Sequence, residues 1–307
     1  MAFVVIAILL GIFVAFSITQ LSTAEPWEDY SSIRGHYERW TIADIGKGFD
    51  IHVKWLLLST SMHIFGNDKI IPFFASIALL VLIYLTTVEL TKKRFAGIVS
   101  MIIVLQSNIF LTYDTSPTYE NFWILFYLFS IYSIFKSWPL SPVSYVLAIF
   151  SKALTAIFFP MTLFFVYRLD IPRKKKMVIA LSYGIIILLF AIGFLAGAKV
   201  VNQGLREFNS HDFWSGFSAF SFELRYDPLV VVSLLPLSIG LLIASRKGVP
   251  YADSIMFFVA SLLFLPSLLV SLTPYGNEPY RFLPLIVFFA IGVGLLLSKR
   301  ISQLAPA

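Results

Sequence analysis

Three carboxylates, Glu25, Glu28 and Asp29, follow directly after the long uncharged run that begins the chain. A carboxylate within hydrogen-bond reach of a hydroxyl can act as general base, which typically contributes ~10²–10⁴-fold to a reaction. Arg281 opens the last apolar run, and a guanidinium binds phosphate through two parallel hydrogen bonds. These residue types suit transfer of a group from a phosphate leaving group to a hydroxyl. The same carboxylates could instead solvate a helix end, and Arg281 could pair with Glu278.

Further candidates stand in the other polar segments between apolar runs. Asp114 lies in "YDTSPTYE" (113–120), and His211 and Asp212 lie in a longer segment. We assign Glu28 and Asp29 as catalytic candidates, and the candidate substrate-binding residues are Arg281, Glu25, His211, Asp212 and Asp114. No H-E-x-x-H or D-x-D motif occurs, so no metal ligand is assigned, although a divalent metal stays open. The absence of cysteine excludes disulfides and thiolate chemistry.

The composition indicates a polytopic membrane protein. The 307 residues are 58% hydrophobic and 13% charged, with mean hydropathy +0.85, whereas soluble domains are nearer 45–50% apolar and about 25% charged. The apolar runs are continuous, which favours an all-α protein with about eight helices of the roughly 20 residues that a crossing needs. The expected spans are 2–22, 70–90, 96–112, 121–135, 177–198, 229–245, 254–273 and 282–298. We expect the first to be a retained membrane helix and not a signal peptide.

The segment 142–169 is apolar but interrupted by Lys152 and Pro160. Basic residues flank it on both sides, so a single crossing would place one basic flank on the wrong side of the membrane. A lysine at mid-bilayer costs about 2.5–3.5 kcal/mol on insertion scales, and a bend at Lys152 lowers that cost. We therefore expect a helical hairpin that enters and leaves on the cytoplasmic side.

With this hairpin, the basic residues give one consistent orientation in the cell membrane, with both termini cytoplasmic. Lys and Arg concentrate in cytoplasmic loops of multi-pass proteins, and here 13 lie in the proposed inner loops and nine in the outer ones. The inner residues are Lys92, Lys93, Arg94, Lys136, Arg168, Arg173, Lys174, Lys175, Lys176, Arg246, Lys247, Lys299 and Arg300. The positive charge thus reflects topology, and we expect no nucleic-acid partner.

The chain is expected to form one transmembrane domain over 1–307, with a first outer loop at 23–69 and a second at 199–228. The first loop is too aromatic for disorder and should hold juxtamembrane helices. Arg34 and Glu38 have the spacing of an i,i+4 ion pair. The stretch 51–65 predicts an amphipathic helix in the interface, with Trp55 and Leu58 toward lipid.

The order of these features resembles the GT-C class of membrane glycosyltransferases, which includes the protein O-mannosyltransferases and lipid A aminoarabinose transferases. The resemblance rests on "HVKWLLLSTSMHIFGND", "YDTSPTYENF", "SKALTAIFFPMTLFFVYR" and "EPYRFLPLIVFF". It implies transfer of a sugar from a polyprenyl-phosphate carrier to an acceptor on the outer face. It also implies a carboxylate early in the first outer loop, matched by Glu28 and Asp29, and an arginine opening a late helix, matched by Arg281.

Two other classes stay open. A non-catalytic subunit with a membrane protein partner fits the small size and the missing Asp-x-Asp pair. A transporter fits less well, because such proteins carry ionisable groups near mid-membrane, and only Glu89 and Lys152 lie in apolar runs here. The expected partners are therefore a polyprenyl-phosphate-linked sugar, membrane lipids and, in the second class, another membrane protein.

Overall fold

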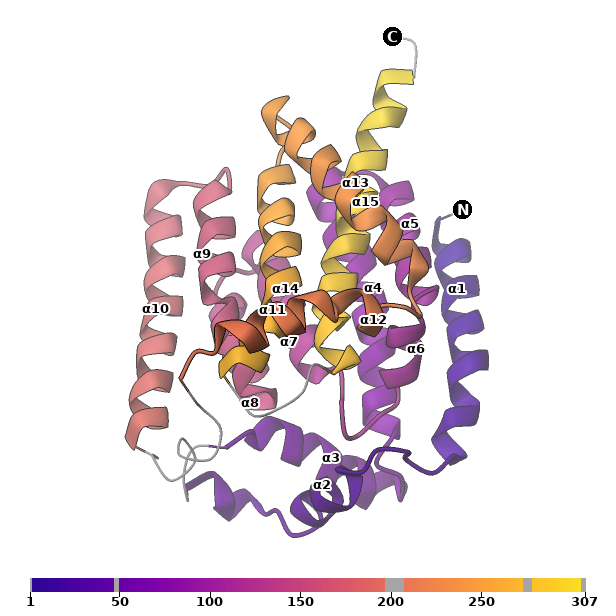
Figure 1. Ribbon diagram of the computed structural model, residues 1–307, viewed down its shortest axis with the longest axis vertical. Coiled ribbons are helices and arrows are strands. Elements are labelled where there is room, and N and C mark those ends of the chain that lie inside the picture. Colours follow the sequence, from indigo (N-terminus) through magenta and orange to yellow (C-terminus); the bar gives the residue numbers. More distant parts are fainter. Residues whose placement is uncertain (1, 47–49, 197–206, 273–277, 305–307) are drawn as a thin grey trace.

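The computed structural model describes residues 2–46, 50–196, 207–272 and 278–304, and all regular structure within these ranges is helical. Long helices form a bundle, and α2 and α3 lie across one end of it (Figure 1). The α-helices are α1 (Ala2–Ser17), α2 (Tyr30–Tyr37), α3 (His52–Phe65), α4 (Ile70–Thr91), α5 (Arg94–Leu105), α6 (Asn108–Tyr113), α7 (Phe122–Lys136), α8 (Leu140–Ser151), α9 (Phe159–Arg168), α10 (Arg173–Ala196), α11 (Ser210–Ser218), α12 (Phe220–Glu223), α13 (Pro228–Arg246), α14 (Ala252–Leu272) and α15 (Leu283–Leu304). The 3₁₀ helices are η1 (Ile18–Ser22), η2 (Ile42–Gly46), η3 (Ala153–Phe158) and η5 (Pro279–Phe282).

Several of these helices could cross a membrane. Within the described residues, six stretches are long and apolar enough: Ala2–Ser22, Ile70–Thr91, Arg173–Gly193, Pro228–Arg246, Ala252–Leu272 and Pro279–Ser298. They coincide with six of the expected spans, which supports a multi-pass membrane protein. The other two expected spans are occupied by shorter helices, because α5 has 12 residues and α7 has 15.

Helix α15 is the centre of the bundle. It packs against α4, α5, α13 and α14, and every side chain from Leu283 to Ile291 is buried. A helix that is apolar on all sides belongs in an interior. Close approach to α5 requires Gly294, since a Cβ there would lie 2.8 Å from the carbonyl oxygen of Ala96. The hydroxyl of Ser100 donates to the carbonyl of Ala290 at 2.8 Å and links the two helices.

Helices α1 and α10 flank the bundle and turn apolar side chains outward. Phe3, Ile8 and Phe16 of α1 are exposed, as are Leu181 and Leu188 of α10. In water such surfaces would be unusual. They are expected where helices face lipid.

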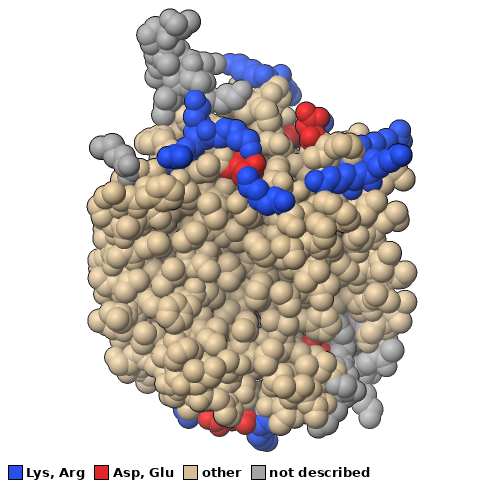
Figure 2. All heavy atoms as spheres, turned by 180° about the vertical axis from the view of Figure 1, so that it is seen from behind, with Lys and Arg blue, Asp and Glu red and all other residues tan. Residues whose placement is uncertain are grey.

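Charge is distributed unevenly over the molecule. Figure 2 shows Lys and Arg gathered at one end, above a broad band without charged residues. Exposed basic side chains occur in the α4–α5 link and at the helix ends beside the α7–α8 and α9–α10 links, at Lys136, Arg168 and Arg173. Glu89 near the end of α4 pairs with Lys136 at 2.6 Å, and Asp253 at the start of α14 pairs with Arg168. We call this the basic end of the molecule.

The described part of the segment 23–69, which was predicted as the first outer loop, is folded against the bundle. Arg34 and Glu38 form the predicted ion pair, with Nε and Oε1 2.7 Å apart. Tyr30 and Tyr37 of α2 both donate hydrogen bonds to Asp68, which ties α2 to the turn before α4. Burial and the neighbouring Asp68 carboxylate raise the pKa of Tyr37, so it stays a hydrogen-bond donor.

The predicted helix at 51–65 exists as α3, but its expected orientation is wrong. Trp55 and Leu58 do not face lipid, because their exposed fractions are 6% and 0%. They form a small buried cluster with Tyr37 and Phe122. An apolar stripe specifies an apolar partner, and the sequence pattern cannot distinguish lipid from protein in that role.

The interrupted segment 142–169 divides into α8, η3 and α9. Helix α8 ends at Ser151, and Lys152 follows it in an extended conformation. Pro160 lies in the first turn of α9, where its missing N–H has no intrahelical partner to lose. The break at Lys152 therefore occurs where the sequence predicts it.

Candidate functional site

Charged side chains from four separate parts of the chain converge near the N-terminus of α15. Lys54 comes from the first turn of α3, Glu120 precedes α7, Lys152 follows α8, and Arg281 lies in η5. The Nζ of Lys54 lies 2.5 Å from Oε2 of Glu120. Lys152 interacts electrostatically with Lys54, Glu120 and Arg281. We call these four residues the cation cluster.

The charges of the cation cluster do not balance, since three basic side chains share one carboxylate. Lys54 and Glu120 are buried as a pair, with side-chain exposures of 8% and 1%. Arg281 is 9% exposed, and its Nη1 is buried without a hydrogen-bond partner among the described residues. The expected pair between Arg281 and Glu278 is absent from the described ion pairs, and their one hydrogen bond joins backbone atoms. A buried charge without a partner is costly, so a bound anion would stabilise this arrangement of charges.

Aromatic rings hold the cation cluster in place. The Nζ of Lys152 lies 3.9 Å from the ring centroid of Tyr280 and 5.2 Å from that of Trp123. Both distances are within the range of cation–π attraction. The ring of Tyr119 stacks on Tyr280 at 4.3 Å, and Tyr113 meets Tyr280 edge-on at 6.1 Å. Lys152 is half-buried, and cation–π contacts compensate the lost hydration of an ammonium only partly, so Lys152 could bind a negatively charged ligand.

The two catalytic candidates of the first loop differ in their surroundings. Glu28 and Asp29 are both exposed. Asp29 accepts a hydrogen bond from the hydroxyl of Tyr119 at 3.4 Å, and Tyr119 stacks on Tyr280 beside Arg281. Burial first, and then the charge of Asp29, raises the pKa of Tyr119, so its hydroxyl remains the donor. Asp29 is thus connected to the cation cluster through two stacked rings, whereas no such connection to Glu28 is found among the described contacts.

Both carboxylate oxygens of Glu25 interact with neighbouring side chains, which gives this residue a structural role. Its side chain is 2% exposed and pairs with Lys69 at 3.2 Å. Its second carboxylate oxygen accepts a hydrogen bond from the hydroxyl of Ser116. A carboxylate held by a cation and a hydroxyl is a poor base, but it can still contact a ligand from the side of its remaining lone pairs.

Asp114 lies in the interior, between α6 and α7. It accepts a hydrogen bond from Ser17 of α1, and its backbone carbonyl accepts one from Ser76 of α4 at 2.6 Å. Burial raises the pKa of Asp114 to about 7, although the hydrogen bond from Ser17 opposes this shift. Asp114 therefore joins three elements around the site.

His211 and Asp212 are placed elsewhere, at the start of α11. The side chain of His211 is 90% exposed, and its Nδ1 lies 3.5 Å from Oδ1 of Asp212. Helix α11 packs on α14, with Phe217 stacked on Phe264 at 5.1 Å. No described contact joins this pair to the cation cluster.

An apolar groove runs between α8 and α10. It has a volume of about 270 Å³ and is lined by Val146, Ile149, Phe150, Ile186, Leu189 and Phe190. Phe150 lies two residues before Lys152 in the sequence, so one end of the groove lies near the cation cluster. Its chemistry suits a hydrocarbon chain.

No group of three or more His, Asp or Glu side chains is arranged to hold a metal ion within the part of the chain that the structure describes. The segment 199–228, which was predicted as the second outer loop, falls partly outside the described residues, which have a gap at 197–206. No protein-family model, curated protein or solved structure matches this chain.

Sequence reasoning identified Arg281 but did not assign Lys54, Glu120 or Tyr119 to the site. Lys54 sits within an amphipathic helix, where a lysine commonly has no function. The signal that could have found Glu120 is its position in the short outer segment that also holds Asp114. What unites these residues is tertiary proximity across more than 200 positions, which no local pattern encodes.

Proposed function

We propose that this chain is a membrane glycosyltransferase of the GT-C type, which moves a sugar from a polyprenyl-phosphate donor to an acceptor on the outer face. The observation that carries the proposal is the cation cluster, where Lys152 and Arg281 have no carboxylate of their own. A lipid phosphate supplies the missing negative charge. The adjacent groove between α8 and α10 would take the first part of the polyprenyl chain.

The proposed orientation places the basic end in the cytoplasm and the cation cluster toward the outer face. The eight spans then include α5 and α7 as short crossings. The segment 142–169 is the hairpin entered from the cytoplasmic side, with Lys152 at its tip. The 12 residues of α8 extend about 18 Å, which is less than the ~30 Å of a hydrocarbon core. The tip therefore meets residues from the outer loops inside the membrane protein, where charges are shielded from lipid.

The proposed reaction needs a base and a stabilised leaving group. The acceptor hydroxyl oxygen forms a bond to the anomeric carbon, and the bond from that carbon to the phosphate oxygen breaks. The phosphate leaves with the bonding electron pair, and Lys152 and Arg281 stabilise its growing charge. Asp29 takes the hydroxyl proton, and we favour it over Glu28 because of its contact with Tyr119.

A transfer assay tests this proposal. The purified protein in nanodiscs is given a polyprenyl-phosphate sugar and a mixture of outer-face acceptors. Asp29→Asn should reduce turnover ~10²–10⁴-fold and leave donor binding largely intact, because a base acts mainly in the transition state. Glu38→Gln, at another exposed carboxylate of the same loop, is the matched control. Full activity of both Asp29→Asn and Glu28→Gln, or no activity of the wild type with any lipid-linked sugar, would refute the catalytic role.

A second candidate function is that of a non-catalytic subunit in a membrane complex. The observation that favours it is the exposure of both Glu28 and Asp29, since a partner could cover that loop. Isolation of a stable complex from native membranes, together with full function of the carboxylate variants, would select this alternative.

A further inference from the structure

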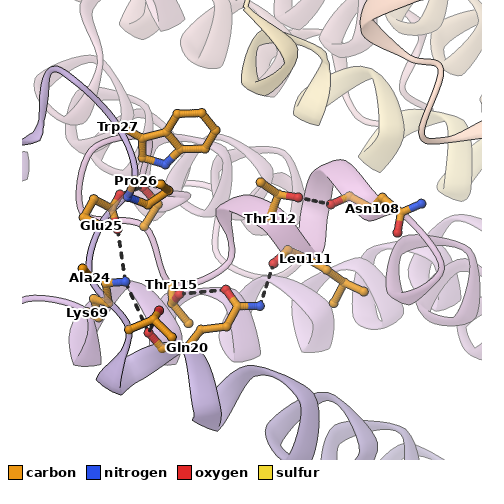
Figure 3. A pocket seen from close by; sticks show the side chains of 12 residues that line it. Gln20, Ala24, Glu25, Pro26, Trp27, Lys69, Asn108, Leu111, Thr112 and Thr115 are labelled. Carbon is orange, nitrogen blue, oxygen red and sulfur yellow. Dashed lines mark hydrogen bonds and ion pairs between the residues drawn. The ribbon is translucent and has the colours of Figure 1, made fainter.

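A second cavity lies beside the cation cluster and has a different character. It has a volume of about 410 Å³ and is bounded by the segment 20–27, Lys69, α6 and the residues that follow it (Figure 3). This volume is within the usual ~300–1,000 Å³ of small-molecule sites. Its lining includes none of Lys54, Lys152 or Arg281, so it is a separate site. We call it the neutral pocket.

The two charged groups of the neutral pocket cancel each other. Glu25 and Lys69 are paired at 3.2 Å, and both side chains are largely buried, at 2% and 7% exposure. Lys69 also donates to the carbonyl of Gln20 at 3.2 Å. An anion or a cation entering this pocket would have to compete with an existing pair. An uncharged ligand meets no such opposition.

The threonine hydroxyls of the neutral pocket offer hydrogen-bond acceptors to a ligand, because their protons are already donated to the protein. Thr23 and Thr112 donate their hydroxyl protons to the carbonyls of Gln20 and Asn108, at 2.8 and 2.7 Å. Their hydroxyl oxygens are thereby oriented and keep lone pairs for a ligand. Ligand hydroxyl groups, which can donate to these lone pairs, complement such a lining.

An aromatic side chain completes the neutral pocket. Trp27 lines it, and its ring is held by Tyr113, stacked at 5.1 Å, and by the edge contact of Tyr119 at 5.3 Å. Its indole N–H donates no hydrogen bond within the described part of the chain, so a donor remains for a ligand. The negative face of an aromatic ring attracts groups with partial positive charge, such as the C–H groups on one face of a pyranose.

From these features we propose that the neutral pocket binds the pyranose ring of an uncharged sugar. A fixed aromatic platform, oriented hydroxyls and a cancelled charge pair are each suited to a polyhydroxylated ring. The inference does not depend on the transfer reaction. If the reaction occurs, Tyr119, which contacts both Trp27 and Tyr280, places the neutral pocket next to the cation cluster.

Saturation-transfer NMR on the full chain in nanodiscs tests this site. The probes are methyl α-glucopyranoside, methyl α-mannopyranoside, methyl β-galactopyranoside and maltose, with inorganic phosphate as the charged competitor. We expect at least one sugar to receive saturation from the wild type, without competition by phosphate. Trp27→Ala should weaken that sugar about tenfold or more, and Thr112→Val should weaken it several-fold. Trp214→Ala, at an exposed tryptophan of α11, is the matched control and should change nothing.

Three results would overturn the proposal: no sugar of the panel binds, phosphate displaces the sugar, or both pocket variants bind like the wild type. If Trp27→Ala does not fold, the test uses Trp27→Phe and Thr112→Val instead. Trp27→Phe keeps an aromatic ring but makes it smaller, and Thr112→Val removes the hydroxyl group with little change in volume. Sugar binding by a wild type that transfers nothing would support this inference while refuting the proposed function. Arg281→Ala should leave sugar binding intact.

Discussion

The cation cluster and the neutral pocket are neighbours joined by aromatic ring contacts, but they differ in charge balance. The charges of the neutral pocket cancel, whereas the cation cluster has more basic than acidic side chains. In the neutral pocket, Glu25 and Lys69 satisfy each other, and the protein alone is electrostatically complete. In the cation cluster, three basic side chains share the single carboxylate of Glu120, and neither Lys152 nor Arg281 forms an ion pair among the described residues. Breaking a buried pair is strongly destabilising. An unbalanced cluster, in contrast, costs stability until a ligand supplies the missing charge.

The largest effect should come from breaking the pair in the neutral pocket. Lys69→Met leaves the buried Glu25 carboxylate without its cation, so we expect a loss of about 3–5 kcal/mol of stability. Thermal unfolding in detergent measures it. Lys92→Met, at an exposed lysine of the basic end, is the control and should have little effect. A Lys69→Met protein as stable as the control would show that the pair is not buried as described.

The cation cluster should respond in the opposite direction. Arg281→Met removes a buried charge whose Nη1 has no hydrogen-bond partner among the described residues, so the melting temperature without ligand should rise. Donor affinity should fall about 10–100-fold, since a hydrogen bond to a charged group contributes about 1.5–3 kcal/mol. Arg225→Met, at an exposed arginine between α12 and α13, should change neither the melting temperature nor the donor affinity. If Arg281→Met lowers the melting temperature and binds the donor as tightly as Arg225→Met does, Arg281 has a structural role and does not bind the phosphate.

A different kind of effect, on the pH dependence of stability, is expected at Asp114, which lies between the neutral pocket and the core. Its pKa is raised to about 7 by burial, above the value of an unfolded aspartate. The folded chain therefore binds more protons than the unfolded chain between about pH 4 and pH 7, and the stabilising contribution is lost as pH rises through this window. Unfolding measured from pH 4 to 8 should show this loss. Asp114→Asn should flatten the dependence, and an unchanged profile would contradict the assignment.

The smallest effect should occur at the exposed pair of α2. Arg34 and Glu38 are each more than 40% exposed in their side chains, and exposed i,i+4 pairs contribute about 0.3–0.5 kcal/mol. Arg34→Ala should therefore change stability barely measurably, and the change should vanish in high salt. A loss comparable to that of Lys69→Met would remove the distinction between buried and exposed pairs on which the comparison depends.

The sequence predicted what depends on local pattern. Continuous apolar runs specify helices, the Arg34–Glu38 spacing specifies a surface pair, and the basic loops gather at one end as expected. It failed where the outcome depends on tertiary partners. Trp55 and Leu58 were predicted to face lipid, because an apolar stripe does not identify what covers it.

The site residues divide in the same way, into those that a local pattern identifies and those that depend on tertiary partners. Arg281 was identifiable because it stands at the start of an apolar helix, where a charged side chain is costly unless it has a partner or a ligand. Lys54 and Glu120 were not assigned, because they matter only through their ion pair and their interaction with Lys152, and these residues are far apart in the chain. Charge balance within a folded site is a property of three-dimensional proximity, so no single segment reveals it.

The central claim is that the cation cluster binds the phosphate of a polyprenyl lipid. Its most direct test compares binding of a polyprenyl-phosphate sugar and of the uncharged polyprenol to the full chain in nanodiscs. The account predicts that the wild type prefers the phosphate lipid, that Lys152→Met and Arg281→Met abolish this preference, and that Arg225→Met retains it. Equal binding of both lipids by the wild type, or an undiminished preference in both cluster variants, would contradict it.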